Sequence, residues 1–85
     1  MSSGHSVFVG NLPYRATEDD LGNLFSQAGR VNGVRIVYDR DTNRAKGFGF
    51  IEFGSEQDAQ NAVSQLDGSE FQGRQLRVNI ATKRN

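Results

Sequence analysis

The sequence predicts a single α+β domain in which a four-stranded antiparallel sheet carries two helices on one face. Four segments alternate apolar and polar residues, which is the period of a half-buried strand. Two other segments place apolar residues three and four positions apart, which is the period of an amphipathic helix. The order is strand, helix, strand, strand, helix, strand, and only one face of each strand is aliphatic. Both helices must therefore cover that face, and the sequence provides no element to cover the other.

The first strand and the first helix are predicted at residues 6–12 and 17–28. In the strand, Phe8 points to the face opposite its valine neighbours because successive side chains alternate. Thr17 is the expected N-cap of the helix, and Asp20 three residues later completes a variant of the capping box. The apolar stripe of this helix consists of Leu21, Leu24, Phe25 and Ala28.

The second and third strands are predicted at residues 31–39 and 46–53, with a turn between them. In the second strand, Arg35 and Val37 face away from the helices. The outward side chains of the third strand, KGFGFIEF, are Phe48, Phe50 and Glu52. The solvent face of an antiparallel sheet is normally polar, so two phenylalanines beside a glutamate need an explanation.

The second helix is predicted at residues 55–67 and the last strand at residues 76–80. Ser55 is the expected N-cap of the helix. Its apolar stripe consists of Ala59, Ala62, Val63 and Leu66. Residues 70–75 are expected to form a connecting turn, in which Phe71 closes the edge of the core.

The uncovered face of the predicted sheet presents aromatic rings among basic and amide side chains. Its expected members are Phe8, Arg35, Val37, Phe48, Phe50, Glu52, Arg77 and Asn79. A small domain buries only about 60% of its unfolded surface, so large apolar side chains left outside the core indicate a binding surface. Aromatic rings among basic residues are typical of surfaces that bind single-stranded nucleic acid. Tyr14, in the loop after the first strand, is expected to pack locally instead.

The charges of the chain are segregated, although ten basic and ten acidic residues give a formal net charge of zero. The two predicted helices contain six acidic residues and no basic residue, so the rest of the chain carries ten basic and four acidic residues. This distribution predicts a basic sheet side and an acidic helical side. The absence of cysteine excludes a disulfide scaffold and a thiolate metal site. No apolar run is long enough to span a bilayer, so we expect no membrane partner.

Two motifs of the sequence resemble those of a known family. VFVGNL in the first strand and KGFGFIEF in the third are similar to the six-residue and eight-residue ribonucleoprotein motifs of the RNA recognition motif, in the same order and on the corresponding strands. The resemblance covers residues 6–81 and implies the ferredoxin-like βαββαβ fold, with the two motifs on the central strands. We therefore expect one RNA recognition motif at residues 6–82, with flexible ends at residues 1–5 and 83–85.

The resemblance also implies roles for individual residues. Phe8 and Phe50 would stack on two successive bases of a single-stranded RNA, and Phe48 would pack against the sugars between them. Lys46 would pair with a backbone phosphate, and Gly47 would let the nucleic acid approach closely. The remaining expected RNA contacts are Arg35, Arg44, Arg77, Asn79, Ala81 and Lys83, from the sheet face, the turn after the second strand and the C-terminal segment.

Three further segments, SVFVGNLPYRATEDDL, VYDRDT and EFQGRQLRV, are similar to the RNA-binding domains of the cleavage stimulation factor branch of this family. That similarity implies U- or GU-rich RNA, mRNA processing at the 3′ end, and a nuclear or nucleocytoplasmic location. Some family members use the sheet face to bind a peptide, so a protein-interaction module is the alternative function. We also expect the isolated domain to be a monomer whose helical face is open to protein partners.

The sequence argues against catalysis, metal binding and a cofactor. A stretch that opens like a calcium loop begins at Asp39, but Arg44 stands where that loop needs glycine and Phe50 where it needs a bidentate glutamate. GFGFIE lacks the third glycine of a dinucleotide-binding fingerprint and lies within a strand. We therefore expect no enzymatic activity, no metal and no cofactor.

Overall fold

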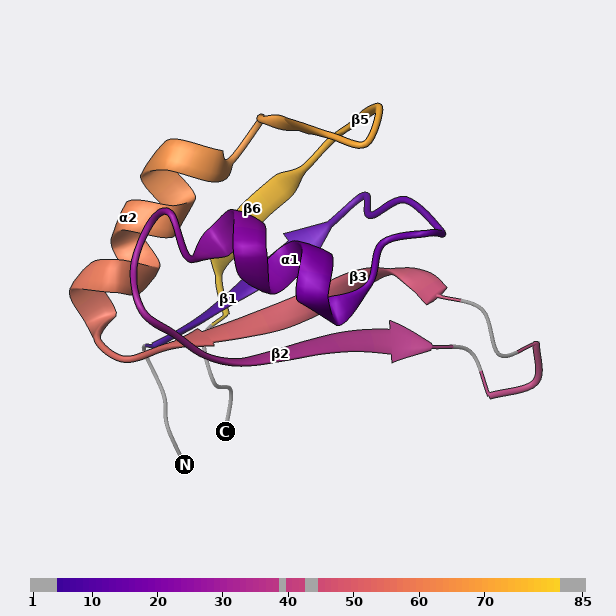
Figure 1. Cartoon of the computed structure of the whole chain (residues 1–85), viewed down its shortest axis with the longest axis horizontal. Helices are drawn as coiled ribbons and strands as arrows, with labels where there is room; N and C mark the ends of the chain where they lie inside the picture. Colours follow the sequence, from indigo (N-terminus) through magenta and orange to yellow (C-terminus); the bar gives the residue numbers. More distant parts are fainter. Residues whose placement is uncertain (1–4, 39, 43–44, 82–85) are drawn as a thin grey trace.

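The computed structural model describes residues 5–38, 40–42 and 45–81, except for the side chains of residues 45 and 46. Its main elements form two layers, a sheet and the helices α1 (Glu18–Phe25) and α2 (Glu56–Leu66). Figure 1 shows both helices on the same side of the sheet. The predicted α+β fold with its βαββαβ order is confirmed, with one small hairpin added before the last strand.

The four strands of the sheet lie in the spatial order β2-β3-β1-β6, and every neighbouring pair is antiparallel. Their bounds are Ser6–Gly10 for β1, Val31–Tyr38 for β2, Ala45–Phe53 for β3 and Arg77–Ile80 for β6. The two strands that carry the ribonucleoprotein-like motifs, β1 and β3, are therefore the central pair. Their register places Phe8 opposite Phe50.

Both helices begin at the predicted caps. The Thr17 hydroxyl accepts a hydrogen bond from the N–H of Asp20, whose carboxylate accepts one from the N–H of Thr17. Ser55 caps α2 by accepting a hydrogen bond from a backbone N–H of the first turn. Helix α1 ends at Phe25 and not at the predicted Ala28, because the chain tightens there and the N–H of Ala28 bonds to the carbonyl of Phe25 at 3.0 Å. Neither described helix has the length and apolar composition needed to cross a membrane.

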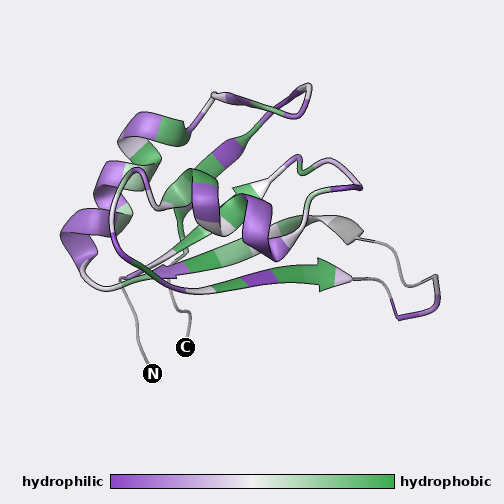
Figure 2. Cartoon of the chain, in the orientation of Figure 1, coloured by the Kyte–Doolittle hydropathy of each residue, from purple (hydrophilic) through white to green (hydrophobic). Residues whose placement is uncertain are grey.

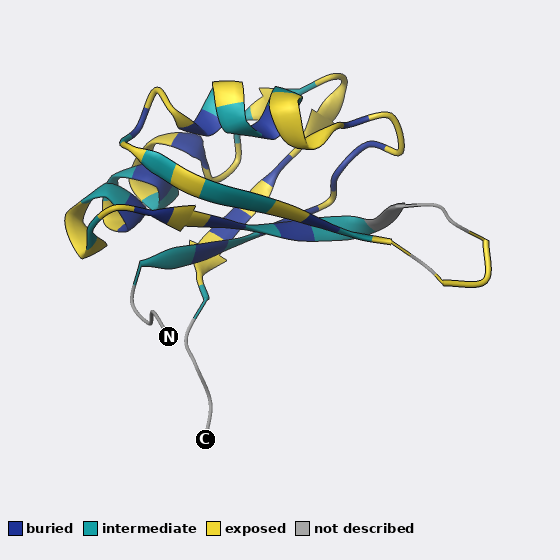
Figure 3. Ribbon diagram, turned by 60° about the horizontal axis from the view of Figure 1, so that its bottom comes forward, coloured by how far each residue is buried: buried dark blue, intermediate teal, exposed yellow. Residues whose placement is uncertain are grey.

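The core lies between the sheet and the helices and is built from the predicted apolar stripes. Figure 2 shows hydrophobic positions along the strands and hydrophilic positions on the outer sides of the helices, and Figure 3 shows that the buried residues lie between these two layers. The largest fully buried side chains are Phe25, Phe53, Leu12, Leu21, Ile51, Leu76, Val7, Val9 and Val78. Phe71 is partly buried against this core, as predicted. The described part of the chain contains no buried polar or charged residue.

Residues 70–75 form a small hairpin where the sequence predicts only a turn. Strand β4 (Glu70–Phe71) pairs antiparallel with β5 (Arg74–Gln75). The two residues between them, Gln72 and Gly73, both have positive φ, at 51° and 86°. This is the two-residue turn whose twist matches that of the flanking strands.

Candidate nucleic-acid interface

A row of four outward-facing side chains crosses the sheet from one edge to the other. Phe8 on β1 lies opposite Phe50 on β3 and opposite Asn79 on β6. Phe50 in turn lies opposite Arg35 on the edge strand β2. Side chains that face each other on antiparallel strands are in contact range. The row therefore combines two neighbouring aromatic rings at the centre with an exposed polar side chain at each end.

Three phenylalanine rings form one cluster at the centre of this face. The ring centroids lie 5.8 Å apart for Phe8 and Phe48, 5.9 Å for Phe8 and Phe50, and 6.2 Å for Phe48 and Phe50. The pairs are tilted or edge-to-face, which are favourable arrangements for aromatic rings. The sequence predicts that these rings lie in the open, and the structure shows them less exposed than that. Each ring is half-buried because its two neighbours cover part of it.

Gly10 leaves room for the Phe8 ring. It lies opposite Phe48 on β3 and Arg77 on β6, so it belongs to the same outward face. A Cβ atom at Gly10 would lie 2.9 Å from Cε2 of Phe8 and 3.1 Å from Cζ. The edge of the Phe8 ring therefore occupies the space over the glycine, and a larger residue would displace the ring.

Gly47 lies at an irregularity near the start of β3. The pairing with β2 shifts between Ile36, which lies opposite Gly49, and Tyr38, which lies opposite Ala45. Gly47 falls in this interval with a φ of 95°, a conformation that glycine adopts at little cost. Apart from its two chain neighbours, no described residue lies within 4 Å of the position that its Cβ would occupy. Backbone conformation thus requires the glycine here, and its role in admitting nucleic acid stays a prediction.

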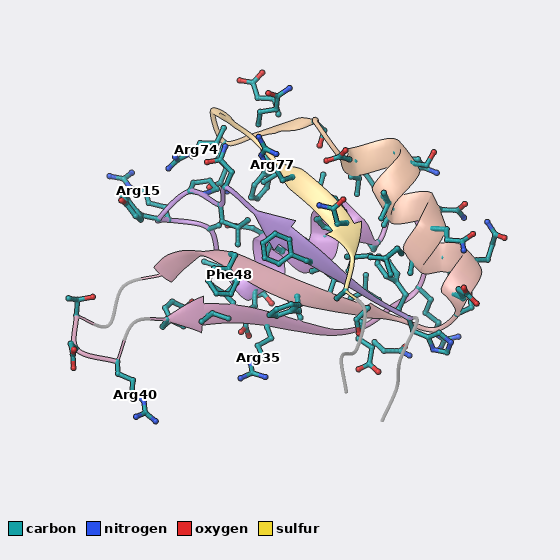
Figure 4. All side chains as sticks on the ribbon, turned by 180° about the vertical axis from the view of Figure 1, so that it is seen from behind. Arg15, Arg35, Arg40, Phe48, Arg74 and Arg77 are labelled. Carbon is teal, nitrogen blue, oxygen red and sulfur yellow. The ribbon has the colours of Figure 1, made fainter. Side chains whose placement is uncertain are left out.

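Exposed basic side chains lie on both sides of the aromatic cluster. Figure 4 shows Arg35 and Arg77 pointing outward from the two edge strands, β2 and β6. The N–H of Ala81 donates to the carbonyl of Ser6 at 2.9 Å, so the pairing with β1 continues one residue past the end of β6.

Three predicted contacts lie outside the described part of the chain. Arg44 and Lys83 are not among the described residues, and only the backbone of Lys46 is described, as part of β3. Their proposed contacts with RNA stay predictions.

The exposed surface extends further than the sequence predicts, to the loop after β1. Tyr14 is 72% exposed, so the prediction that it packs locally is wrong. The N–H of Ala16 bonds to the carbonyl of Pro13 at 3.2 Å and closes a turn, and both of these residues are buried. Tyr14 and Arg15, at the centre of this turn, are therefore directed outward. The sequence signal for this arrangement was the proline that begins the turn.

The comparison with known families decides what kind of domain this is. A family model described as the RNA recognition motif matches residues 7–77. The chain belongs to the RNA recognition motif family. This confirms the family that the sequence resembles.

This RNA recognition motif is similar both to cleavage stimulation factor subunits and to chloroplastic RNA-binding proteins. It is 51% identical over 81 residues to the human cleavage stimulation factor subunit 2 tau variant, across 94% of the chain and 13% of that protein. It is 48% identical over 78 residues to RNA-binding protein CP29B, chloroplastic, of Arabidopsis thaliana, across 92% of the chain and 27% of that protein. The chain therefore spans a minor part of either relative.

A solved structure with bound RNA is also similar to this RNA recognition motif. The structure of the Rna15 RRM with bound RNA (GU) has a TM-score of 0.83 and 32% sequence identity, and the match covers 96% of this chain and 86% of that one. At this identity, the likeness extends beyond the fold to the sequence of the domain.

The helical side of the RNA recognition motif is acidic, as predicted. The acidic residues in the first turns of the two helices are Glu18, Asp19, Asp20, Glu56 and Asp58. Neither helix has a basic residue in its last turn. The sheet side instead carries exposed Arg35 and Arg77. This distribution of charge favours the sheet side over the helical side for a polyanion, although the sheet face also carries the exposed Glu52.

Proposed function

We propose that this RNA recognition motif binds a short single-stranded RNA on its open sheet face. The observation that carries the proposal is the cluster of Phe8, Phe48 and Phe50 on a face that no described element covers. Unpaired bases stack on such rings with a gain of about 1–3 kcal/mol per base, whatever their sequence. A duplex does not offer its bases to a flat sheet in this way, because they are stacked and paired inside the helix.

Phe8 and Phe50 carry two successive bases in this proposal, and Phe48 packs against the sugars that join them. Support comes from the register, which places the first two rings side by side on the central strands. Asn79 lies next to Phe8 at the end of the row, where its amide can donate to and accept from a base edge. The chain from Asn79 through Ala81 to Lys83 then reads further base edges.

The basic side chains of the sheet side hold the phosphates. Arg35 and Arg77 stand on opposite sides of the aromatic cluster, and a strand of RNA that crosses the rings passes both. In the proposal, Arg44 and Lys46, which lie close in sequence to the start of β3, provide further contacts with phosphates. Because the sheet face offers only a few cations, the electrostatic share of the affinity is modest.

We infer a preference for U- or GU-rich RNA and a role in mRNA 3′-end processing. The support is the similarity to a cleavage stimulation factor subunit and to the Rna15 domain with bound GU RNA. A nuclear or nucleocytoplasmic location goes with that role. The chloroplastic relative has nearly the same identity, so base preference is a more direct test than location. In this role a single domain at residues 6–82 positions RNA for a larger protein and catalyses no reaction.

A titration of the 85-residue chain with fluorescently labelled RNA tests the proposal. Three probes of equal length are compared by anisotropy: a GU repeat, an A-rich strand and a duplex. We expect the GU repeat to bind most tightly and the duplex to bind least. Failure to bind either single strand would refute RNA binding and favour the peptide-binding alternative. Equal affinity for the two single strands would refute only the inferred base preference.

A further inference from the structure

The edge strand β6 has one side that faces away from the sheet. In an antiparallel strand, the N–H groups of successive residues point alternately to the two sides. The N–H of Ala81 donates to the carbonyl of Ser6, the first residue of β1, so the N–H of Val78 points away from β1. That outward N–H does not stay free: it donates to Oδ1 of Asp67 at 2.9 Å.

The same arrangement occurs at the opposite edge of the sheet, on β2. The N–H of Phe53 donates to the carbonyl of His5 on the β1 side, so the N–H of Phe50, three residues earlier, points to β2. Phe50 is paired with Arg35 on β2, and the N–H of Arg35 therefore points to β3. The next residue, Ile36, therefore points its N–H away from the sheet. It donates to Oε2 of Glu18 at 3.2 Å.

The two carboxylates come from different helices. Glu18 is the first residue of α1 and Asp67 is the C-cap of α2, and these helices lie along β2 and β6. The backbone that follows Asp67 bonds to Leu76, the residue just before β6. Gly68 donates to the carbonyl of Leu76 at 2.9 Å, and Leu76 donates to that of Ser69 at 2.8 Å. The Asp67 carboxylate binds the next N–H that points away from the sheet, which is that of Val78.

We propose that Glu18 and Asp67 keep the sheet edges closed to a second copy of this chain. An open edge strand is a template for strand addition, and a charged side chain over it is one way in which natural sheets prevent that pairing. An incoming strand would have to displace the carboxylate from the N–H and bury its charge. This function of the two residues is independent of RNA binding.

The two edge strands differ in length, and the strands that pair decide which assembly of copies would form. Strand β2 offers an edge of eight residues, whereas β6 offers four. Pairing of β2 with β2 gives a closed two-fold dimer, and pairing of β2 with β6 gives an open chain of copies. Because β2 offers the longer edge, Glu18 is the more important of the two residues.

Glu18→Ala in the 85-residue chain tests the proposal, with Asp19→Ala as the matched control. Both substitutions remove one carboxylate from the first turn of α1, but only Glu18 contacts a sheet edge. Sedimentation velocity over a range of protein concentrations reports the oligomeric state. We expect Glu18→Ala to form a dimer at concentrations where the wild type and Asp19→Ala are monomers. We also expect the Ile36 amide of the dilute variant to exchange with solvent faster than in the wild type.

Glu18→Asp provides a second variant in case Glu18→Ala does not fold. It keeps a negative charge at the start of α1, which suits the helix dipole, but shortens the reach of the carboxylate by one methylene. We expect it to dimerise as well. A folded Glu18→Ala or Glu18→Asp variant that stays a monomer at every concentration, or whose Ile36 amide exchanges as in the wild type, would overturn the proposal.

Discussion

Phe8 and Phe50 lie directly opposite each other on the two central strands, with ring centroids 5.9 Å apart and ring planes at 65°. On the other face of the same strands, Val9 and Ile51 are fully buried in the core. The backbone that carries the two rings is therefore fixed by core packing and not by a loop. A surface that is ordered before binding loses less conformational entropy when the ligand arrives.

Removal of either central ring should weaken RNA binding far more than it weakens the fold. We expect Phe8→Ala and Phe50→Ala each to cost about 1–3 kcal/mol of binding free energy, because each removes one stacking surface. The free energy of unfolding should fall by only about 0.5–1.5 kcal/mol, since the ring loses aromatic neighbours but leaves no cavity in the core. Anisotropy titration and urea unfolding measure the two quantities.

Two controls sharpen that comparison. Phe8→Leu keeps an apolar side chain without an aromatic face, and it should bind RNA as weakly as Phe8→Ala. Phe25→Ala removes a fully buried ring and should lower the free energy of unfolding by about 3–5 kcal/mol. Sheet-face variants that unfold as readily as Phe25→Ala while binding RNA normally would contradict the assignment.

Gly10→Ala tests whether the orientation of the Phe8 ring matters. The added Cβ would lie 2.9 Å from the ring edge, so the ring must move, and a ring on the surface can do so at little cost in stability. We expect weaker RNA binding with a nearly unchanged free energy of unfolding. NMR spectra of the free variant should show shifted Phe8 ring signals, and unchanged affinity despite such shifts would argue against stacking on that ring.

The salt dependence of binding reports how many phosphates are contacted. We expect log Kd to rise only gently with log salt, because each neutralised phosphate contributes a slope of about 0.7 for single strands. Arg35→Ala and Arg77→Ala should each reduce the slope by roughly one contact. Arg30→Ala is the control, since the side chain of Arg30 lies against Gly54 before α2. A steep slope that no single arginine changes would indicate a diffuse basic surface instead.

Gly22→Ala should stabilise the domain. Gly22 lies inside α1, where glycine costs about 1 kcal/mol relative to alanine. A Cβ there would lie 3.5 Å from Cγ2 of Val34, which is an ordinary contact. We expect urea unfolding to give a free energy higher by about 1 kcal/mol. Gly49→Ala should do the opposite, because its Cβ would lie 2.5 Å from the carbonyl oxygen of Arg35.

The Asp20 carboxylate should contribute to the loss of stability in acid. Its pKa is lowered by the hydrogen bond from the Gln72 side chain and then by those from the Thr17 backbone and hydroxyl. A pKa that is lower in the folded state gives stability above the unfolded pKa, and this stability is lost as the pH falls through the folded pKa. Asp20→Asn should therefore show a smaller fall in unfolding free energy between neutral and acidic pH. Identical pH profiles for wild type and variant would contradict this.

The fold was predictable because its elements are long enough to show a period. The alternation of apolar and polar residues predicts the strands β1 and β3. The capping residues Thr17 and Ser55 predict where the two helices begin. The hairpin β4–β5 was not predictable, since strands of two residues have no period to detect. The end of α1 at Phe25 depends on a tightened turn that the apolar pattern does not record.

For the candidate site, the sequence predicts which side chains share one face of the sheet, but not how they are arranged on it. Alternation alone placed the three phenylalanines, Arg35 and Asn79 on one side of the sheet. The half-buried state of the rings depends on how far they lean toward one another, which the register and rotamers decide. Pro13 indicates the turn that contains Tyr14, but the exposure of Tyr14 also depends on the burial of the residues that close this turn, which a sequence pattern does not encode.

The central claim is that unpaired bases stack on Phe8 and Phe50. Nuclear Overhauser effects between the ring protons of these residues and the base protons of a short GU-repeat RNA test it most directly. The account predicts contacts from Phe8 and Phe50 to two successive bases, with Phe48 near the sugar between them. A complex in which the bases contact only other surfaces of the domain, or a folded protein that shows no contacts with RNA at all, would contradict it.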